Sequence, residues 1–183
     1  MLEGKRVFLR HFVETDAPTL LKWGQDEHYH ELAAFEKIAD LSEAQTASSQ
    51  YAKRPYSYAL CLKSSKEVIG LVELYERGMD LQGGLLKTKE LGFLLDKNFE
   101  HHGYMTEGLA LIFDDAFGVK GQTEIWAGTF SSNLKAQKFL ENLHFRYMYT
   151  ADYSQITNLF SYQEKYYLLK REEWLKIKQN TKS

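Results

Sequence analysis

Residues 89–118, KELGFLLDKNFEHHGYMTEGLALIFDDAFG, join an apolar run to a patterned helix through a short polar loop. The run Leu91–Leu95 predicts a buried strand, and Gly103 lies in the loop that follows. Apolar residues then recur at i, i+3, i+4, i+7 and i+8, which is typical of one buried helical face: Leu109, Ile112, Phe113, Ala116 and Phe117. Gly118 is predicted to end this helix. Such a strand–loop–helix unit offers unpaired backbone N–H groups to an anion, although an ordinary βα turn has the same outline.

Two common phosphate-binding motifs are absent from this stretch. No Gly-Lys-Ser/Thr follows the loop, so the unit is not a Walker A motif. The dinucleotide-binding fingerprint needs three glycines at the start of a βαβ repeat, and two of the three are missing. The identity of the anion therefore has to come from the rest of the chain.

The string HHGYMTEG (His101–Gly108) resembles the acetyl-CoA pyrophosphate loop of the GNAT superfamily of N-acetyltransferases. Further segments resemble that superfamily in the same order along the chain: residues 1–23, its first strand and helix; 90–109, its fourth strand, loop and third helix; 133–145, its Asn-x-x-Ser…Gly-Phe segment; and 167–174, its closing strand. The branch they resemble contains ribosomal-protein N-terminal acetyltransferases and spermidine acetyltransferases.

The resemblance implies an α/β fold, in which a mixed, strongly twisted sheet of about six to seven strands is flanked by helices on both faces. The fourth and fifth strands would splay apart to admit the pantetheine arm. Residues 1–183 are expected to form a single acetyltransferase-like domain. The implied cosubstrate is acetyl-CoA, and the implied reaction transfers its acetyl group directly, in a ternary complex, to a primary amine of a protein N-terminus or a small molecule.

Several positions depart from the family pattern. Within the loop, Glu100 replaces Gln or Arg, His101 replaces a glycine, His102 replaces Lys, Arg or Gln, and Met105 replaces a small residue. Further along the chain, the departures are Ala136 for Ser, Leu140 for the Tyr that serves as general acid, and His144 for Gly. The departures at Glu100, His101, Ala136 and Leu140 favour an alternative reading, a catalytically weak or silent CoA-binding or interaction domain of the same fold.

Composition limits the partners and the compartment. The formal net charge is −2 over 183 residues, so there is no overall electrostatic attraction to nucleic acid or to a membrane surface. The chain has no run of about 18 apolar residues and no signal-like N-terminus. Its one cysteine, Cys61, excludes an internal disulfide, fits a reducing cytoplasm, and is read as a packing residue. A homodimer is left open, because exposed sheet edges in such folds often pair.

No metal site is expected. His28 and His30 form His-x-His, and His101 and His102 adjoin Glu100. Neither group has the i, i+4 spacing that would bring ligands together on a helix, and a metal needs three or four convergent ligands.

Periodicity predicts the remaining elements. Strands are predicted at 6–12, 56–62, 68–75, 124–130, 145–153 and 165–170, with a flexible turn at 77–88 and a loop at 154–164. Thr15 or Asp16 is predicted to cap a first helix, and Ser42 with Gln45 to form a capping box for a second. Asn133 is predicted to cap a helix whose apolar face is Ala136, Phe139, Leu140 and Leu143.

The candidate catalytic residue is Glu90. A primary alkylamine is mostly protonated at neutral pH, so acetyl transfer benefits from a carboxylate that accepts its proton. Glu90 begins the fourth strand, where several GNAT enzymes carry a base, and Glu73 on the third strand is the second choice. The alternative for Glu90 is a strand-end carboxylate that only solubilises the edge of the sheet.

The resemblance also implies cofactor contacts. Leu94 and Leu95 would donate backbone N–H groups to the pantetheine amides and the acetyl oxygen, while their side chains pack in the core. Asn133 would bind the cofactor arm in addition to capping its helix. The remaining expected cofactor-binding residues form the loop: His102, Gly103, Tyr104, Met105 and Thr106.

Two segments are expected to wall the acceptor pocket. The acidic residues lie between the first two helices (Asp26, Glu27, Glu31, Glu36 and Asp40), and the aromatic residues lie before the last strand (Tyr153, Phe160 and Tyr162). Acidic and aromatic groups suit a cationic amine. The alternative for the acidic residues is a solvated helix face.

Overall fold

The computed structural model describes residues 1–77, 87–153 and 162–181. Two compact units can be distinguished: Met1–Leu74 with Phe93–Ile112, and Tyr75–Gly92 with Phe113–Ser183. We call them the first and second unit. Two strands, Val68–Glu76 and Thr88–Leu95, and one helix, Tyr104–Phe113, each contain residues of both units.

The strands confirm the predicted mixed α/β class. Within the described residues they form an 8-stranded sheet of order β1-β2-β3-β4-β5-β6-β8-β7. Their bounds are β1 Leu2–Glu3, β2 Val7–Arg10, β3 Ser57–Leu62, β4 Val68–Glu76, β5 Thr88–Leu95, β6 Glu124–Phe130, β7 Arg146–Asp152 and β8 Gln163–Lys170. The expected count of six to seven strands was too low, because the two-residue β1 pairs with β2 through Leu2 and Leu9 and lacks any periodic pattern of its own.

The described α-helices are α1 Ala17–Gly24, α2 Glu27–Ala33, α3 Leu41–Lys53, α4 Tyr104–Phe113, α5 Leu134–Asn142 and α6 Arg171–Thr181. A 3-10 turn, Glu14–Asp16, precedes α1, and another, Lys97–Phe99, follows β5. Within the described ranges, none of the helices is both long and apolar enough to cross a membrane.

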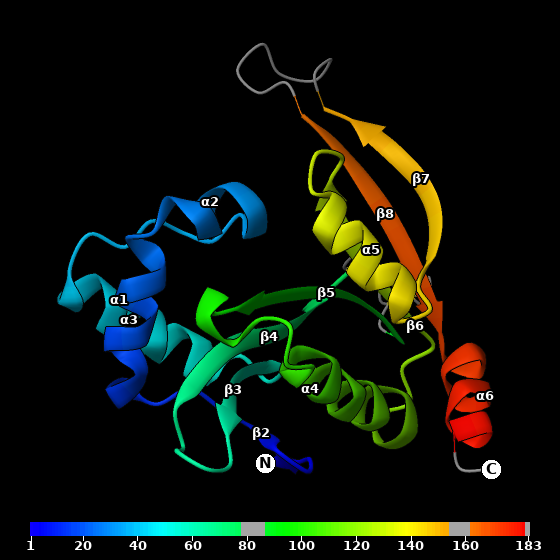
Figure 1. Cartoon of the computed structure of the whole chain (residues 1–183), viewed down its shortest axis with the longest axis horizontal. Coiled ribbons are helices and arrows are strands. Elements are labelled where there is room, and N and C mark those ends of the chain that lie inside the picture. Colours follow the sequence, from blue (N-terminus) through cyan, green and yellow to red (C-terminus); the bar gives the residue numbers. More distant parts are fainter. Residues whose placement is uncertain (78–86, 154–161, 182–183) are drawn as a thin grey trace. The chain divides into compact units, whose positions relative to one another are not determined.

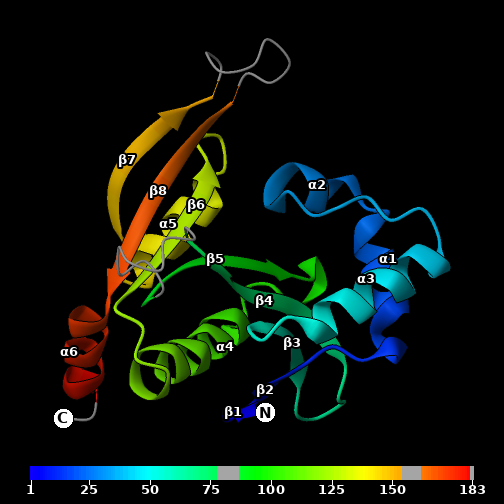
Figure 2. The same cartoon turned by 180° about the vertical axis from the view of Figure 1, so that it is seen from behind.

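In the first unit, helices cover both faces of the antiparallel strands β1 to β4. Ala59 and Cys61 of β3 belong to a buried cluster with side chains of α1, α2 and α3, and α1 and α3 lie side by side (Figure 2). Leu60, which points to the opposite face, contacts Gly108 of α4. A Cβ on Gly108 would lie 2.7 Å from Leu60 Cδ1, so glycine allows α4 to pack closely on the sheet.

In the second unit, β6 pairs along its whole length with β8, from Glu124↔Lys170 to Phe130↔Glu164, and β8 also pairs with β7. Helix α5 packs against β6 and β7, and α6 follows β8 (Figure 1). The parallel pairing of β5 with β6 is short and ends at Glu90↔Trp126. Strands β5 and β6 are the two that the family resemblance predicts to splay apart.

Two predicted helix caps were wrong. Asp16 precedes α1, but its side chain makes no cap; its carboxylate accepts hydrogen bonds from Arg10 at 2.6 and 2.8 Å and from the Val13 N–H. Helix α3 begins before Ser42, and Asp40 caps it by accepting from the Glu43 N–H at 2.9 Å. A carboxylate outcompetes a hydroxyl because it is a charge-assisted acceptor at the positive end of the helix.

The end of the patterned helix and the end of the chain also needed correction. Gly118 does not stop the helix, since α4 passes into a π-helical turn, Asp114–Val119, and the left-handed residue after it is Gly121 (φ 68°). Residues 171–174, expected in the closing strand, begin α6. Trp174 Nε1 donates to Asp114 Oδ1 at 2.9 Å, a tertiary contact that a local pattern does not reveal. Helix α2 was missed, because its seven residues are too few to show a period.

Two predicted loops fall largely outside the described residues. Residues 78–86 contain most of the expected turn, and 154–161 contain most of the loop before the last strand, including Phe160.

The C-terminal end of α5 explains one departure from the family pattern. His144 stands where a glycine is expected, and its backbone is left-handed (φ 66°). The preceding helix closes around it, with the Phe145 N–H donating to Leu140 O at 3.0 Å. The position therefore keeps the backbone of a glycine C-cap while it carries a side chain, which costs roughly 1–2 kcal/mol.

We expect the substitution His144→Gly to raise the free energy of unfolding by about 1 kcal/mol, because it relieves this backbone strain. Urea denaturation measures the change. The matched control is Asn142→Gly, two residues earlier in the helix, which should lower stability by about 0.5–1 kcal/mol. Destabilisation of both variants to the same extent would contradict the strain.

Candidate functional site

The loop before α4 has the backbone expected of an anion site. Two of its residues are left-handed: His101 (φ 62°) and Gly103 (φ 75°). Helix α4 then begins at Tyr104, and the first N–H groups of a helix have no partner within it. Left-handed residues in a turn before a helix make the N–H groups converge on a concave surface that suits a phosphate.

The departure at His101 leaves this backbone in place. The family pattern has a glycine there, and the structure shows why, since φ is positive. Histidine tolerates that region at an energetic cost. Gly103 keeps the second left-handed position without strain, and a Cβ there would lie 3.4 Å from Arg6 Nη2. The conformation of the loop is thus preserved although its sequence has changed.

Arg6, in the turn before β2, holds the loop to the helix in the first unit. Its Nη1 donates to His102 O at 2.9 Å, and its Nε donates to Glu107 Oε2 at 2.9 Å. Its backbone N–H donates to Glu107 Oε1 at 2.7 Å, and its guanidinium lies 5.0 Å from the ring centroid of Tyr104. Burial alone would raise the pKa of Glu107, but the hydrogen bonds from Arg6 outweigh it and lower the pKa. The side chain that closes this loop therefore comes from about 100 residues earlier in the chain.

The three other loop departures have different consequences. Met105 is buried, and its Cε lies 3.3 Å from where a Cβ on Gly70 would be, so its side chain fills the core and leaves the loop surface clear. Its part in anion binding can only come from its N–H group. The carboxylate of Glu100 lies 3.7 Å from His101 Nε2, and a protonated imidazole would offset its charge. His102 stacks on Tyr104 with ring centroids 5.5 Å apart.

A second group of contacts fixes the segment that leads into the loop. Asp96, directly after β5, accepts from Lys22 Nζ at 2.6 Å, from Trp23 Nε1 at 3.2 Å and from the Asn98 N–H at 3.0 Å. Burial would raise the pKa of Asp96, but these hydrogen bonds hold it below the usual value of an aspartate. The beginning of the loop is thereby anchored to α1 in the core of the first unit.

The residues expected to contact the pantetheine arm are mostly buried. Leu94 is buried in the core, and its carbonyl oxygen lies 2.6 Å from where a Cβ on Gly70 would be, which shows how closely β4 and β5 approach. Leu95 is half-buried at the end of β5. Asn133 is buried and caps α5, as predicted, by accepting from the Ala136 N–H at 3.0 Å. Leu140, at the position of the missing general acid, is fully buried.

Glu90 lies in a cluster of charged and aromatic side chains in the second unit. Arg77 Nη1 donates to Glu90 Oε2 at 2.7 Å, and Arg77 Nη2 donates to Tyr149 Oη at 2.9 Å. The guanidinium lies 4.4 Å from the ring centroid of Trp126 and 5.1 Å from that of Tyr166. Glu90 is therefore an ion-paired, half-buried carboxylate, unlike the solvated strand-end residue of the alternative reading.

The neighbours of Glu90 shift its pKa in opposite directions. Burial raises the pKa of Glu90, the charge of Arg77 lowers it, and the charge of Glu164 raises it, with a net upward shift. Tyr166 Oη donates to Glu164 Oε2 at 2.8 Å and lies 3.1 Å from Tyr153 Oη. Burial and these neighbours also raise the pKa of Tyr166. A carboxylate with a raised pKa is better matched to a proton transfer near neutral pH.

Glu73, the second candidate base, has a structural role. Its carboxylate is buried in the first unit, where it accepts from Ser57 Oγ at 2.7 Å and Arg54 Nη1 at 3.0 Å. Arg54 also lies 4.7 Å from the ring centroid of Tyr51. A carboxylate with these partners ties β3, β4 and the end of α3 together.

Several of the acidic residues expected to wall an acceptor pocket already have protein partners. Asp26 pairs with Lys97 at 2.5 Å, Glu27 with Lys37 at 3.2 Å, and Asp40 caps α3. Glu36 Oε1 accepts from Tyr51 Oη at 3.2 Å. These four carboxylates therefore have structural contacts within the protein. The structure gives no contact that would assign Glu31 to an acceptor pocket. Of the expected aromatic residues, Tyr153 and Tyr162 pack against each other at 5.1 Å.

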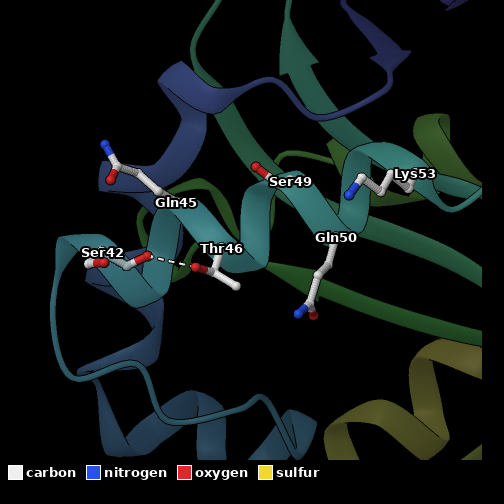
Figure 3. Close-up of a pocket in the computed structure, with 6 residues that line it drawn as sticks. All are labelled: Ser42, Gln45, Thr46, Ser49, Gln50 and Lys53. Carbon is white, nitrogen blue, oxygen red and sulfur yellow. Dashed lines mark hydrogen bonds between the residues drawn. The ribbon is translucent and has the colours of Figure 1, made fainter.

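Two other features carry little chemistry. A shallow hollow on the surface of α3 is lined by uncharged polar residues and one lysine: Ser42, Gln45, Thr46, Ser49, Gln50 and Lys53 (Figure 3). Cys61 is fully buried, and burial raises the pKa of its thiol to about 11, which fits a packing role. Among the described residues, no group of three His, Cys, Asp or Glu side chains is arranged to hold a metal ion.

Sequence reasoning missed the residues that surround the predicted ones. Arg6 lies in the first matching segment, where nothing in the sequence marks it as a contact of the loop, and Arg77 lies outside the matching segments. Glu164 and Tyr166 lie on β8, far along the chain from Glu90. Alternation along β8 places Glu164 and Tyr166 on one face, but sequence alone does not reveal which carboxylate faces them.

Comparison with known proteins places the chain in a family. Residues 6–146 match the model of the acetyltransferase (GNAT) domain. A protein of Bacillus subtilis, "Probable N-acetyltransferase YjcK", is 30% identical over 155 residues, which are 79% of this chain and 83% of that protein.

Solved structures have the same fold. A GNAT-family acetyltransferase from Bacillus anthracis superposes with a TM-score of 0.81 and 15% identity, covering 94% of this chain and 99% of that one. Spermidine N-acetyltransferase from Vibrio cholerae, solved with CoA and spermine, superposes with a TM-score of 0.77 and 15% identity over 94% and 99% of the two chains. The family match over most of the chain, together with the loop geometry, shows that this chain is an N-acetyltransferase of the GNAT family, whose cosubstrate is acetyl-CoA.

Proposed function

We propose that this protein transfers the acetyl group of acetyl-CoA directly to a primary amine, with Glu90 as the base. The observation that carries the proposal is the loop before α4, which keeps left-handed backbone at both His101 and Gly103 although one glycine has been replaced. A backbone-built anion site does not need the side chains that have changed. We propose residues 1–183 as one functional acetyltransferase domain.

The loop would hold the pyrophosphate through backbone N–H groups of Gly103, Tyr104, Met105 and Thr106, with His102 beside them. The positive end of the α4 dipole favours the negative charge. Leu94 and Leu95 would donate N–H groups to the pantetheine arm and the acetyl oxygen. Asn133 would bind the arm only through the part of its side chain that the α5 cap does not use.

Glu90 would accept the proton that an alkylammonium must lose before its nitrogen can attack. Acetyl-CoA supplies a thioester, whose carbonyl carbon forms the new C–N bond while the C–S bond breaks and CoA leaves as the thiol. The raised pKa of Glu90 strengthens it as a proton acceptor, and its half-buried position limits competition from water. No general acid is assigned, because Leu140 replaces the expected tyrosine; the thiolate would take its proton from solvent.

The acceptor class is proposed from chemistry and from the branch that the sequence resembles. That branch comprises enzymes for ribosomal-protein N-termini and for spermidine, and one structural neighbour was solved with spermine. Both kinds of acceptor present a primary amine. We propose a cytoplasmic enzyme, since its single cysteine is a buried thiol, and an acceptor that is neither nucleic acid nor membrane.

A CoA-binding domain without transfer activity is the second candidate. The ion pair between Arg77 and Glu90 favours it, because a carboxylate neutralised by an arginine is a weaker proton acceptor. The buried Leu140 in place of an acid favours it as well.

We expect Glu90→Gln to lower kcat/KM by about 10²-fold or more, because glutamine cannot accept the proton. The assay follows release of the CoA thiol with peptides bearing free N-termini, spermidine and an aminoglycoside as acceptors. Glu67→Gln is the matched control, since it removes an exposed carboxylate in the turn before β4 and should leave the rate unchanged. Equal rates for wild type and Glu90→Gln would contradict the assignment of the base. If wild type binds acetyl-CoA and transfers to none of these acceptors, the second candidate is favoured.

We expect Gly103→Ala to weaken acetyl-CoA binding by roughly tenfold, because a Cβ disfavours the left-handed backbone that aims the N–H groups. Isothermal titration calorimetry measures the dissociation constant. His101→Gly is the matched control, which removes a side chain from the same loop, relieves strain and should preserve binding. A Gly103→Ala variant that binds like wild type, or a His101→Gly variant that loses binding, would exclude this loop as the pyrophosphate site.

A further inference from the structure

We propose that Arg77 is the positioning residue for Glu90, holding its carboxylate ionised and oriented, and that Glu164 opposes it. This inference rests on the proposed role of Glu90 as the base. No motif of the family resemblance includes either residue. Both act through Glu90, and neither is proposed to touch the reacting atoms.

The contacts of Arg77 show how firmly it is held in the second unit. One guanidinium nitrogen donates to Glu90 Oε2 at 2.7 Å, and the other terminal nitrogen donates to Tyr149 Oη at 2.9 Å. The planar group packs against Trp126 and Tyr166, at 4.4 and 5.1 Å from their ring centroids. Two hydrogen bonds and two aromatic rings define its position, so Arg77 can fix the orientation of the carboxylate that it binds.

Neighbouring side chains fix the aromatic rings in turn. Trp126 Nε1 donates to Glu124 Oε2 at 3.0 Å, and Tyr149 stacks on Tyr166 with ring centroids 5.0 Å apart. The hydroxyl of Tyr166 donates to Glu164 at 2.8 Å. The partners of Arg77 are thus supplied by β5, β6, β7 and β8, and all four strands contribute to its position.

Glu164 enters the cluster from β8. A Cβ on Gly128 would lie 2.4 Å from Glu164 Oε1, so glycine leaves the space that the carboxylate occupies over β6. Its carboxylate accepts from Tyr166, whose ring packs on Arg77, and its negative charge makes ionisation of Glu90 less favourable. Burial and Glu164 therefore raise the pKa of Glu90, and Arg77, which is paired with it, lowers that pKa.

The charged and titratable groups around Glu90 give a signed expectation. They are Arg77 from the end of β4, Glu164 and Tyr166 from β8, and Tyr149 from β7, whose hydroxyl binds Arg77. Loss of Arg77 removes the attraction that favours the ionised form, so the titration midpoint of Glu90 should rise. Loss of the Glu164 charge removes a repulsion, so the midpoint should fall.

The experiment is a pH titration of the Glu90 carboxyl carbon by NMR on the full-length protein labelled with [5-¹³C]glutamate. The Glu90 signal is assigned by its loss in Glu90→Gln. We expect a higher midpoint in Arg77→Gln, a lower midpoint in Glu164→Gln, and a midpoint near wild type in Arg77→Lys, which keeps the charge. Circular dichroism confirms that each variant is folded. Because Gln at position 164 can still accept from Tyr166, that variant changes the charge with little change in contacts.

An unchanged or lower midpoint in Arg77→Gln, or shifts of the same sign in Arg77→Gln and Glu164→Gln, would overturn the inference, because a purely structural role predicts no opposite shifts. This readout needs no acceptor or acetyl-CoA, so it can succeed even if the proposed reaction fails. For an active enzyme, the acid limb of the kcat/KM profile should move in the same directions: to higher pH in Arg77→Gln and to lower pH in Glu164→Gln.

Discussion

The left-handed backbone at Gly103 is the constraint on which the loop before α4 depends. It turns the chain from the end of β5 into α4, so that the first N–H groups of the helix are free for an anion. The direction of α4 is fixed separately, by its close approach to Leu60 at Gly108 and by the pair of Arg6 with Glu107. These contacts within the first unit place the positive end of a helix dipole at the loop.

Conservation of backbone conformation also accounts for most departures from the family pattern. His101 and His144 both replace expected glycines, and both have positive φ values, 62° and 66°. At both positions the backbone is still left-handed, and the histidine side chain makes that conformation strained. The side chain of Met105 is buried in the core beside Gly70, so it does not alter the surface of the loop. By contrast, Leu140 for tyrosine changes chemistry, because a buried leucine cannot supply a proton.

The sequence predicted what is local and periodic. The buried face of α4, the Asn133 cap and the strands β3, β4 and β6 follow from patterns of two or 3.6 residues. The parts that could not be predicted depend on tertiary contacts. Asp16 pairs with Arg10 and does not cap α1. Residues 171–174 are helical, and Trp174 donates a hydrogen bond to Asp114. Glu90 is paired with Arg77, which no spacing rule identifies. In this candidate site, the residue types were predictable and their electrostatic partners were not.

The most direct test of the central claim is the set of backbone amide shifts in ¹H–¹⁵N NMR spectra as CoA is added to the full-length protein. We predict saturable binding, with the largest shifts at the amides of residues 103–106, where the pyrophosphate would accept hydrogen bonds. No binding at millimolar CoA would contradict it. So would binding whose largest shifts lie elsewhere, for example on the polar face of α3 (Figure 3).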